Sequence, residues 1–181
     1  AILYMNQRLW GMTTQSWTNE AAERFAVKGE DGKVAQEVYN TFTRQPCATM
    51  CMGTEFWRQK YAGLAERAVT DLGVNGIYMD QACTSLACYD PRHGHPMGGG
   101  VYWMHGFQAL ESDIRARCAS RPEPVVLAGE GCGEPWLPYL DLMLSLEISR
   151  ARYMTPSAGW ETIPFFQAVH HPCAVQFGNY S

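Results

Sequence analysis

The sequence predicts an α/β domain built on a mainly parallel sheet. Short apolar runs of strand length alternate with segments whose apolar residues recur every three or four positions. Strands that are apolar on both faces are typical of parallel sheets covered by helices. Polar residues collect where several of these runs end, which is where a (β/α)₈ barrel carries its functional groups. We therefore expect a partial (β/α)₈ TIM barrel with about five or six strands.

The first third of the chain contains two expected strands and the start of a helix. Residues 1–6 (AILYMN) form a continuous apolar run, and residues 47–52 (CATMCM) form a weaker one. Apolar residues from Trp57 to Leu72 then share one helical face. Thr54 is the expected N-cap of this helix, and Gly73 lies just past its end.

The rest of the chain repeats the alternation of strand and helix. Residues 76–80 (GIYMD) predict a buried strand, and apolar residues from Trp103 to Cys118 predict a second helix, which Pro122 and Pro124 end. Three further strands are expected at residues 124–130 (PVVLAGE), 141–147 (DLMLSLE) and 163–171 (IPFFQAVHH).

The barrel is favoured over an open dinucleotide-binding sheet. Such a sheet needs glycines directly after a strand, whereas the dense run Gly98–Gly100 comes roughly twenty residues after one. A whole barrel takes about 250 residues, and the chain begins at Ala1 directly on a strand-like run. We therefore expect residues 1–181 to be a single domain cut from a longer chain.

Composition argues against several classes of partner. The chain is 46% hydrophobic and 18% charged, with a net charge of -4 and no cluster of Lys or Arg, so neither nucleic acid nor a membrane surface is an expected partner. No apolar run is long enough to cross a bilayer. The seven cysteines are an odd number and do not identify a redox compartment, so localisation stays open.

Asp80 and Glu130 are the candidate catalytic residues. Side chains alternate along a strand, so Tyr78 shares a face with Asp80, and Ala128 shares one with Glu130. On neighbouring parallel strands about 4.8 Å apart, these two acids would face each other. Two carboxyl groups about 5 to 5.5 Å apart are typical of a retaining glycosidase. Either acid could instead cap a turn or pair with an arginine, and Glu134 and Glu147 are weaker candidates for the acid role.

Other polar and aromatic residues are candidates for substrate binding. Strand ends and the loop after Asp80 offer hydrogen-bonding groups for sugar hydroxyls, and tryptophans that follow strand ends could pack on the apolar face of a sugar. The candidates are Asn6, Trp10, Gln81, His93, His95, Trp136, His170 and His171.

The loop at residues 81–100 also permits a metal interpretation. Cys83, Cys88, His93 and His95 supply zinc-type ligands, but a single residue between the histidines departs from the usual H-x₃₋₅-H spacing. We therefore expect no metal and favour a substrate-binding loop, since long loops are usually functional. Cys83 and Cys88 could also form a small disulfide or remain free thiols.

Four stretches of the sequence resemble a bacterial family with a glycosidase-type TIM barrel, related to the α-amylase superfamily and the endo-α-N-acetylgalactosaminidases. They are GVNGIYMDQ, CYDPRHGHPMGGGVYW, VVLAGEG and IPFFQAVHH. The resemblance implies that Asp80 is the nucleophile and Glu130 the acid/base. Amylase-type enzymes carry a His-Asp pair after the seventh strand, whereas this chain has His170, His171 and Pro172, so an amylase-like subsite is not implied.

These observations lead to one preferred function and two alternatives. The preferred function is retaining hydrolysis of a glycosidic bond in a carbohydrate substrate, with no cofactor. A catalytically silent carbohydrate-binding barrel would use the same cleft without turnover. A metal-dependent hydrolase would use the cysteines and histidines of the 81–100 loop.

Overall fold

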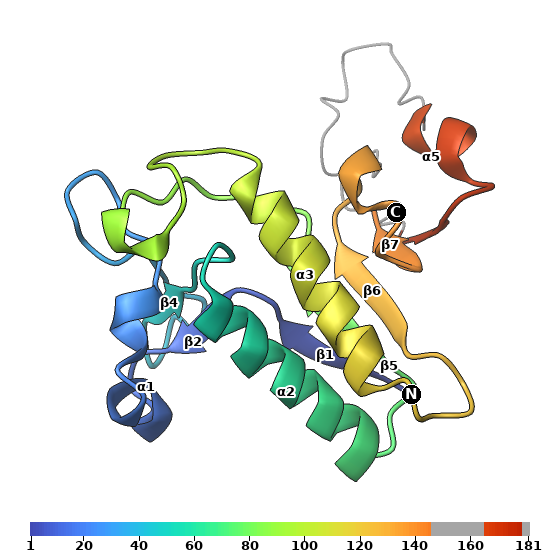
Figure 1. The fold of residues 1–181 in the computed structure, drawn as a ribbon, viewed down its shortest axis with the longest axis horizontal. Coiled ribbons are helices and arrows are strands. Elements are labelled where there is room, and N and C mark those ends of the chain that lie inside the picture. The colour runs from blue at the N-terminus through green and yellow to red at the C-terminus, as the bar shows by residue number, and fades with distance from the viewer. Residues whose placement is uncertain (146–164, 179–181) are drawn as a thin grey trace.

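The computed structural model describes residues 1–145 and 165–178 and is centred on a parallel sheet. The five strands lie in the order β1-β5-β6-β7-β8, and each neighbouring pair is parallel (Figure 1). Their bounds are β1 Ile2–Asn6, β5 Gly76–Asp80, β6 Val126–Glu130, β7 Leu142–Leu144 and β8 Val175–Phe177.

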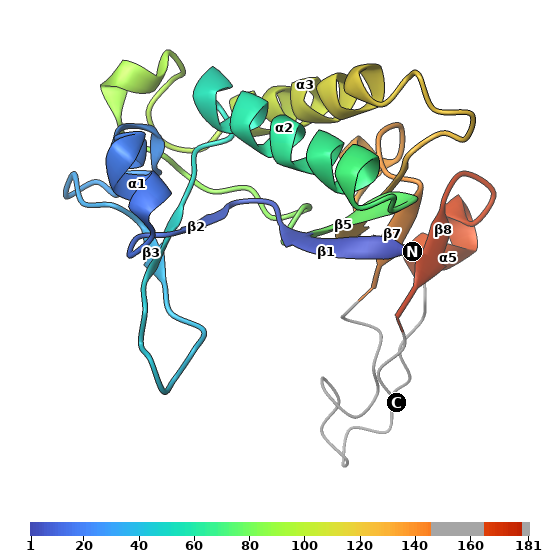
Figure 2. The ribbon, with the colours of Figure 1, turned by 90° about the horizontal axis from the view of Figure 1, so that it is seen from below.

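Two long helices cover one face of this sheet. Helix α2 (Glu55–Asp71) connects to β5, and α3 (Tyr102–Arg117) connects to β6; both lie on the same side of the strands (Figure 2). The apolar stripes of the helices meet alternate strand residues, and the fully buried members include Ile77, Met79 and Leu127. The helices and the sheet pack together to form the hydrophobic core. The parallel register of the sheet places the carboxyl ends of β1, β5 and β6 side by side.

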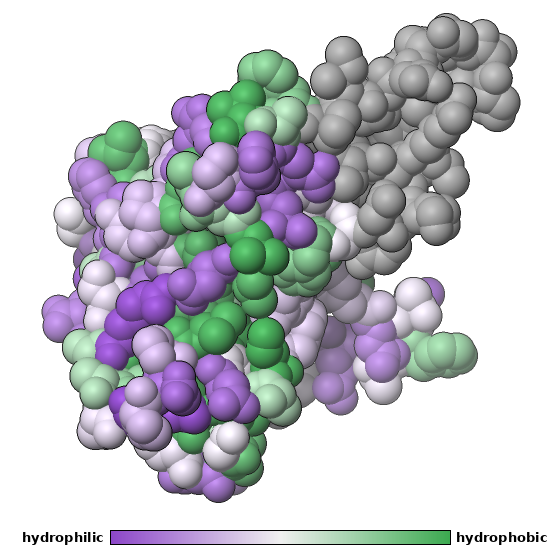
Figure 3. Space-filling model, turned by 90° about the vertical axis from the view of Figure 1, so that its right-hand side faces the viewer, coloured by the Kyte–Doolittle hydropathy of each residue, from purple (hydrophilic) through white to green (hydrophobic). Residues whose placement is uncertain are grey.

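The opposite face of the sheet carries no helix in the described part of the chain. Tyr4, Tyr78, Val175 and Phe177 line a shallow depression of about 500 Å³ on it, and Tyr4 is 61% exposed. Figure 3 shows the right-hand side of the molecule as drawn in Figure 1, where hydrophobic residues are exposed between hydrophilic ones. Because parallel sheets are usually covered on both faces, an open apolar face fits the inner wall of a partial barrel.

A second, antiparallel sheet is inserted between β1 and α2. Its strands are β2 Leu9–Gly11, β4 Cys47–Thr49 and β3 Gln36–Glu37, in the order β2-β4-β3. The short helices α1 (Gln15–Asn19) and η1 (Ala22–Phe25) belong to the same insert. The insert therefore lies beyond the carboxyl end of β1, next to the strand ends of the main sheet (Figure 2).

The remaining connections are loops with short helical turns. The loop between β5 and α3 includes η2 (Pro91–His93), and Cys88 and Gly98 form an antiparallel bridge across its base. The turn η3 (Glu134–Trp136) follows β6, and α5 (Phe165–His170) precedes β8.

Most of the predicted elements are confirmed, and the exceptions have local causes. The strands predicted at residues 1–6, 76–80 and 124–130 and both long helices are present. Thr54 occupies the N-cap position of α2, but its hydroxyl donates to the carbonyl of Cys51 instead of capping the helix. Residues 47–52 contribute β4 to the antiparallel sheet and not a barrel strand, because the insert supplies their partners.

The strand predicted at residues 163–171 is wrong. Residues 165–170 form α5, and the fifth strand of the sheet is β8, which pairs with β7 farther along the chain. The apolar run IPFFQAV is too short for its periodicity to separate helix from strand. Of the prediction at 141–147, β7 covers Leu142–Leu144, and Glu147 lies outside the described residues. In the described ranges, no helix is both long and apolar enough to cross a bilayer.

Candidate active site

The two candidate acids end neighbouring strands and interact. Asn6 pairs with Asp80 across β1 and β5, and Met79 pairs with Gly129 across β5 and β6, so Asp80 and Glu130 are the next residues at the same height. Their carboxyl groups approach within hydrogen-bonding reach of each other. The alternation along the strands, which predicted that these side chains share a face, is thus seen in the structure.

The environment of Glu130 favours its protonated form. Burial, the negative charge of Asp80 and a hydrogen bond with the Asp80 carboxylate raise the pKa of Glu130 above the usual glutamate range. Two contacts act in the opposite direction: the backbone N–H of Gln81 donates to Oε2 of Glu130 at 2.9 Å, and Arg8 contributes positive charge. The net effect is a pKa of Glu130 above that of an ordinary glutamate.

Asp80 is held by two side chains of β1. The hydroxyl of Tyr4 donates to Oδ2 of Asp80 at 2.5 Å, and Nδ2 of Asn6 donates to the same oxygen at 2.8 Å. Burial and the hydrogen bond to Asp80 raise the pKa of Tyr4 to about 12, so the phenol keeps its proton. Oδ1 of Asn6 accepts from the backbone N–H groups of Arg8 and Leu9, which fixes the amide.

Gln81 connects the acids to the inserted sheet. It adopts a φ of 60°, a left-handed conformation that is uncommon for a residue with a side chain and that turns the chain sharply after β5. Its Nε2 donates to Oε2 of Glu37 at 3.1 Å and to the hydroxyl of Tyr39 at 2.6 Å. Its Oε1 accepts from Asn6 at 3.0 Å.

A partly buried ion pair forms the wall of the site on the insert side. Nη2 of Arg8 lies 2.9 Å from Oε1 of Glu37, and the Arg8 side chain is only 7% exposed. Burial acts to raise the pKa of Glu37, but hydrogen bonds from Tyr39 and Gln81 together with Arg8 lower it overall. Glu37 is therefore an ionised, fully engaged carboxylate.

Two of the predicted sugar platforms are part of the core. Trp10 is 8% exposed, stacks on Phe56 and donates from Nε1 to Ser16. Trp136 is 9% exposed and meets Phe107 edge to face. Each indole packs against another aromatic ring, a contact that its position after a strand end does not reveal.

The predicted histidines do not join the acids. His170 pairs through Nε2 with Oε1 of Glu134 at 3.3 Å, and His171 is exposed with its ring against the carbonyl of Ala168. Both follow from α5 being a helix, which removes them from a strand end. The exposed carboxylate of Glu134 therefore faces His170 and has no contact with Asp80 in the described structure.

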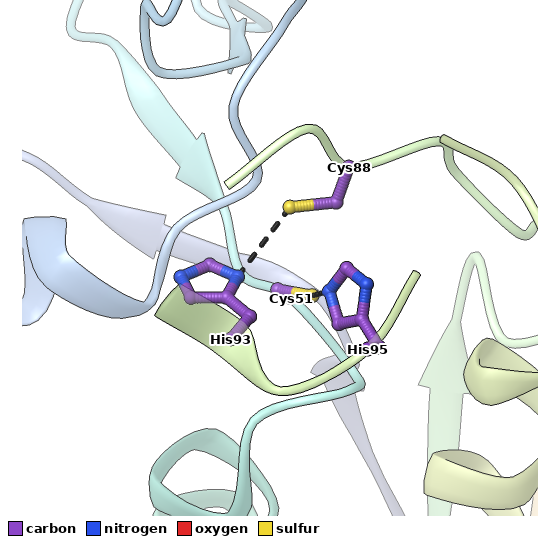
Figure 4. Close-up of side chains that lie close together, drawn as sticks. All are labelled: Cys51, Cys88, His93 and His95. Carbon is purple, nitrogen blue, oxygen red and sulfur yellow. Dashed lines mark hydrogen bonds between the residues drawn. The ribbon is translucent and has the colours of Figure 1, made fainter. Parts of the chain in front are cut away.

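His93 and His95 lie in a separate cluster with Cys51 and Cys88 (Figure 4). Cys83, which the sequence placed in this group, lies beside β6 instead, with its backbone N–H donating to the carbonyl of Glu130 at 3.0 Å. Cys83 and Cys88 are free thiols. Hydrogen-bond contacts with Cys51 and with His93 lower the pKa of Cys88.

Four residues around the acids were not predicted. Tyr4 precedes Asn6 by two positions, so the same alternation that placed Asp80 could have identified it. Arg8, Glu37 and Tyr39 belong to the insert region. Glu37 and Tyr39 bind Gln81 and Arg8 binds Glu37, and these contacts depend on the pairing of β3 with β4. No local pattern in the sequence signals that pairing.

The arrangement supplies the parts of an acid and nucleophile pair. One carboxyl group tends to keep its proton, the other is oriented by a phenol and an amide, and the two are in contact. Contact between the carboxyl groups leaves no room for the water molecule that inverting glycosidases hold between their two acids.

Comparison with known proteins points to the same class of fold. The profile of a family described as Domain of unknown function (DUF6259) matches residues 1–181. A protein of Bacteroides thetaiotaomicron named "Putative glycoside hydrolase" is 26% identical over 177 residues, which are 97% of this chain and 25% of that protein.

Two solved structures share the fold at low identity. The α-N-acetylgalactosaminidase of Bifidobacterium bifidum in complex with GalNAc has a TM-score of 0.66 at 14% identity, over 96% of this chain and 26% of that one. The α-galactosidase of Thermus thermophilus in complex with stachyose has a TM-score of 0.53 at 13% identity, over 78% and 27%. The chain thus spans about a quarter of the length of these proteins.

Proposed function

The chain belongs to the family described as Domain of unknown function (DUF6259), and from this premise we propose that it carries the catalytic pair of a retaining glycoside hydrolase. A relative named "Putative glycoside hydrolase" and the fold shared with an α-N-acetylgalactosaminidase support the proposal. The observation that supports this proposal is the contact between Asp80 and Glu130 at adjacent strand ends, with the pKa of Glu130 raised. Asp80 is then the nucleophile and Glu130 the acid/base.

The first step forms a covalent glycosyl-enzyme. One oxygen of Asp80 attacks the anomeric carbon, the bond from that carbon to the glycosidic oxygen breaks, and Glu130 gives its proton to the departing oxygen. Tyr4 and Asn6 both bind Oδ2, so we assign the attack to Oδ1.

The second step returns the enzyme to its starting state. Glu130, now ionised, takes a proton from a water molecule as the water oxygen attacks the anomeric carbon, and the ester bond to Asp80 breaks. The raised pKa of Glu130 suits both steps, because the group must be protonated before the first and ionised before the second.

The substrate class that we propose is an α-linked galactose-type glycoside. The structural neighbours were solved with GalNAc, stachyose and an aryl α-galactoside. The rings of Tyr4 and Tyr78 stack with their centroids 5.7 Å apart, and Phe177 meets Tyr78 edge to face. Because Tyr4 also binds Asp80, this aromatic surface lies beside Asp80. Such a surface suits the apolar face of a sugar ring.

The proposal is tested with p-nitrophenyl α-D-galactopyranoside, its GalNAc analogue and the corresponding glycosyl fluorides. Asp80→Asn should lose at least about 10³-fold in kcat/KM on every substrate, because no nucleophile remains. Glu130→Gln should lose much less in kcat/KM on these substrates, because p-nitrophenolate and fluoride both depart with little help from an acid. Its kcat should still fall on every substrate, because no general base remains to activate water in the second step.

Glu134→Gln is the matched control, because Glu134 is an exposed carboxylate in η3, the short helical turn that follows β6. It should retain wild-type rates. Turnover that survives Asp80→Asn would exclude the assigned nucleophile, and sugar binding without turnover by the wild-type protein would favour a silent carbohydrate-binding barrel.

A further inference from the structure

Four potential metal ligands converge at the base of the loop between β5 and α3. Cys51 comes from the junction of β4 and α2, and Cys88, His93 and His95 come from the loop. One ligand atom from each residue lies within 4.8 Å of all the others. Sγ of Cys51 is 3.2 Å from Nε2 of His95, and Sγ of Cys88 is 3.4 Å from Nδ1 of His93 (Figure 4).

These separations are close to those around a tetrahedral zinc ion. Zinc bonds of about 2.3 Å to sulfur and about 2.0 to 2.1 Å to nitrogen put neighbouring ligand atoms about 3.3 to 3.8 Å apart. The two sulfur–nitrogen separations of 3.2 and 3.4 Å lie close to this range, and the other ligand atoms, within 4.8 Å of one another, would need to move together by about 1 Å at most.

Both imidazoles are held with one nitrogen free to bind. Nε2 of His93 lies 2.9 Å from the carbonyl of Arg24 and must donate its hydrogen there, so Nδ1, which faces Cys88, keeps its lone pair. Nδ1 of His95 likewise donates to the carbonyl of Pro96 at 2.7 Å, which leaves Nε2 facing Cys51. Histidines that bind metal ions are oriented in this way by the hydrogen bond of the other ring nitrogen.

The surroundings hold the ligands in place. Cys51 and Cys88 are fully buried, and the ring of His95 stacks on Tyr102 at 3.7 Å with an interplanar angle of 1°. A side chain at Gly53 would place its Cβ 2.5 Å from Cδ2 of His95, so glycine is required for this approach.

We infer that Cys51, Cys88, His93 and His95 bind one Zn²⁺ ion in a closed tetrahedral site. Two thiolates and two imidazoles are ligands that favour zinc over calcium or magnesium, which prefer oxygen. Four protein ligands leave no position for a water molecule, so the ion has a structural role and is not a catalytic centre. Each thiol gives up its proton when the ion binds.

The site would fix the loop that begins in the candidate active site. Cys51 belongs to the segment that leads into α2, and the other three ligands lie beyond Gln81, whose N–H binds Glu130. The ion therefore joins the insert and the β5–α3 loop, which approach each other on the left of Figure 1. This inference stands independently of the hydrolase proposal, since metal content is measured without a sugar.

The test begins with the wild-type protein, purified with reductant and without chelators or an affinity metal. Elemental analysis should find about one zinc per chain. Removal of the ion by a strong chelator should lower the melting temperature by about 10 °C or more, and added Zn²⁺ should restore it. Co²⁺ in place of Zn²⁺ should give the intense visible bands of tetrahedral cobalt with thiolate charge transfer.

Variants identify the ligands. Cys51→Ser with Cys88→Ser should lose the zinc, whereas Cys47→Ser with Cys173→Ser removes two thiols outside the cluster and should keep it. Wild-type protein without stoichiometric metal and without the cobalt spectrum would overturn the inference. So would a thiol count showing that Cys51 and Cys88 form a disulfide in the purified protein.

Discussion

At the scale of single residues, the candidate nucleophile depends on a phenol from the neighbouring strand. Tyr4 donates to Oδ2 of Asp80 at 2.5 Å, and a hydrogen bond to a charged group contributes about 1.5 to 3 kcal/mol. Tyr4 thus orients the carboxylate while Oδ1 remains available. The hydroxyl, and not the ring, is the part of Tyr4 that this role requires.

Tyr4→Phe should therefore lower kcat by about 10- to 100-fold on aryl α-glycosides, with KM changed less because the ring remains. The rate is measured by release of the aryl group, and circular dichroism confirms the fold. Tyr89→Phe is the control, because Tyr89 binds Glu30 on the surface. A Tyr4→Phe enzyme with wild-type kcat would remove Tyr4 from the proposed mechanism.

Glu111 is a second acid whose protonation follows from burial. It lies on the inner face of α3 with 0% exposure, and neither carboxyl oxygen has a hydrogen-bond partner in the described structure. Burial raises the pKa of Glu111 to about 9, Arg115 opposes the rise and Asp141 adds to it. The folded state therefore retains a proton that the unfolded chain releases near the ordinary value of 4.5.

The sign of the pH dependence follows. The folded state binds more protons than the unfolded state between about pH 4.5 and pH 9, so this group lowers the free energy of unfolding as pH rises through that window. Glu111→Gln cannot ionise, so it should exceed the wild type by about 1 to 3 kcal/mol at pH 7. The gap should close towards pH 4.

Urea unfolding at pH 4.5, 7 and 8.5, spanning the window between the two pKa values, measures this difference. Glu123→Gln, in the exposed loop before β6, is the control and should give a pH profile parallel to the wild type. A Glu111→Gln gap that stays constant with pH would mean that Glu111 is ionised in the folded protein.

At the scale of elements, two glycines in long helices have opposite roles. Gly106 in α3 lies against the loop before α2, where an added Cβ would be 2.1 Å from the backbone oxygen of Met52. Gly63 in α2 has only Nη1 of Arg117 nearby, at 3.9 Å. One glycine permits a close approach of backbone, and the other only weakens its helix.

Gly106→Ala should therefore lower the free energy of unfolding by about 2 to 3 kcal/mol, whereas Gly63→Ala should raise it by about 0.5 to 1 kcal/mol. Denaturant unfolding of the two variants beside the wild type measures both changes. Equal effects would show that the close contact of α3 with Met52 is not present in solution.

How well the sequence predicted each element depended on how local its signal was. Helices α2 and α3 and strands β1, β5 and β6 have long or clearly bounded patterns, and they were predicted almost to the residue. The error at α5 arose because a short apolar run carries no decisive period. Of the antiparallel insert, only β4 lies in a predicted strand, the run at residues 47–52. The sheet itself was missed because its strands contain two or three residues each and pair with partners distant in sequence.

At the scale of the whole molecule, the acids could be placed from the sequence, but most of their surroundings could not. The parallel pairing of β5 with β6 turns two positions 50 residues apart into neighbours, and alternation alone is sufficient to see it. The cysteine and histidine cluster required Cys51, which is far from the loop in sequence, so spacing within the loop pointed to Cys83 instead.

The insert between β1 and α2 has a consequence for how this domain can diversify. Glu37 and Tyr39 reach the strand ends from a sheet that shares no strand with the main one. Exchange of residues 9–50 between relatives could therefore alter the surroundings of Gln81 while the strands that carry Asp80 and Glu130 stay in place. Under the proposed function, differences in substrate choice between relatives would then arise in the insert, and the main sheet would stay unchanged.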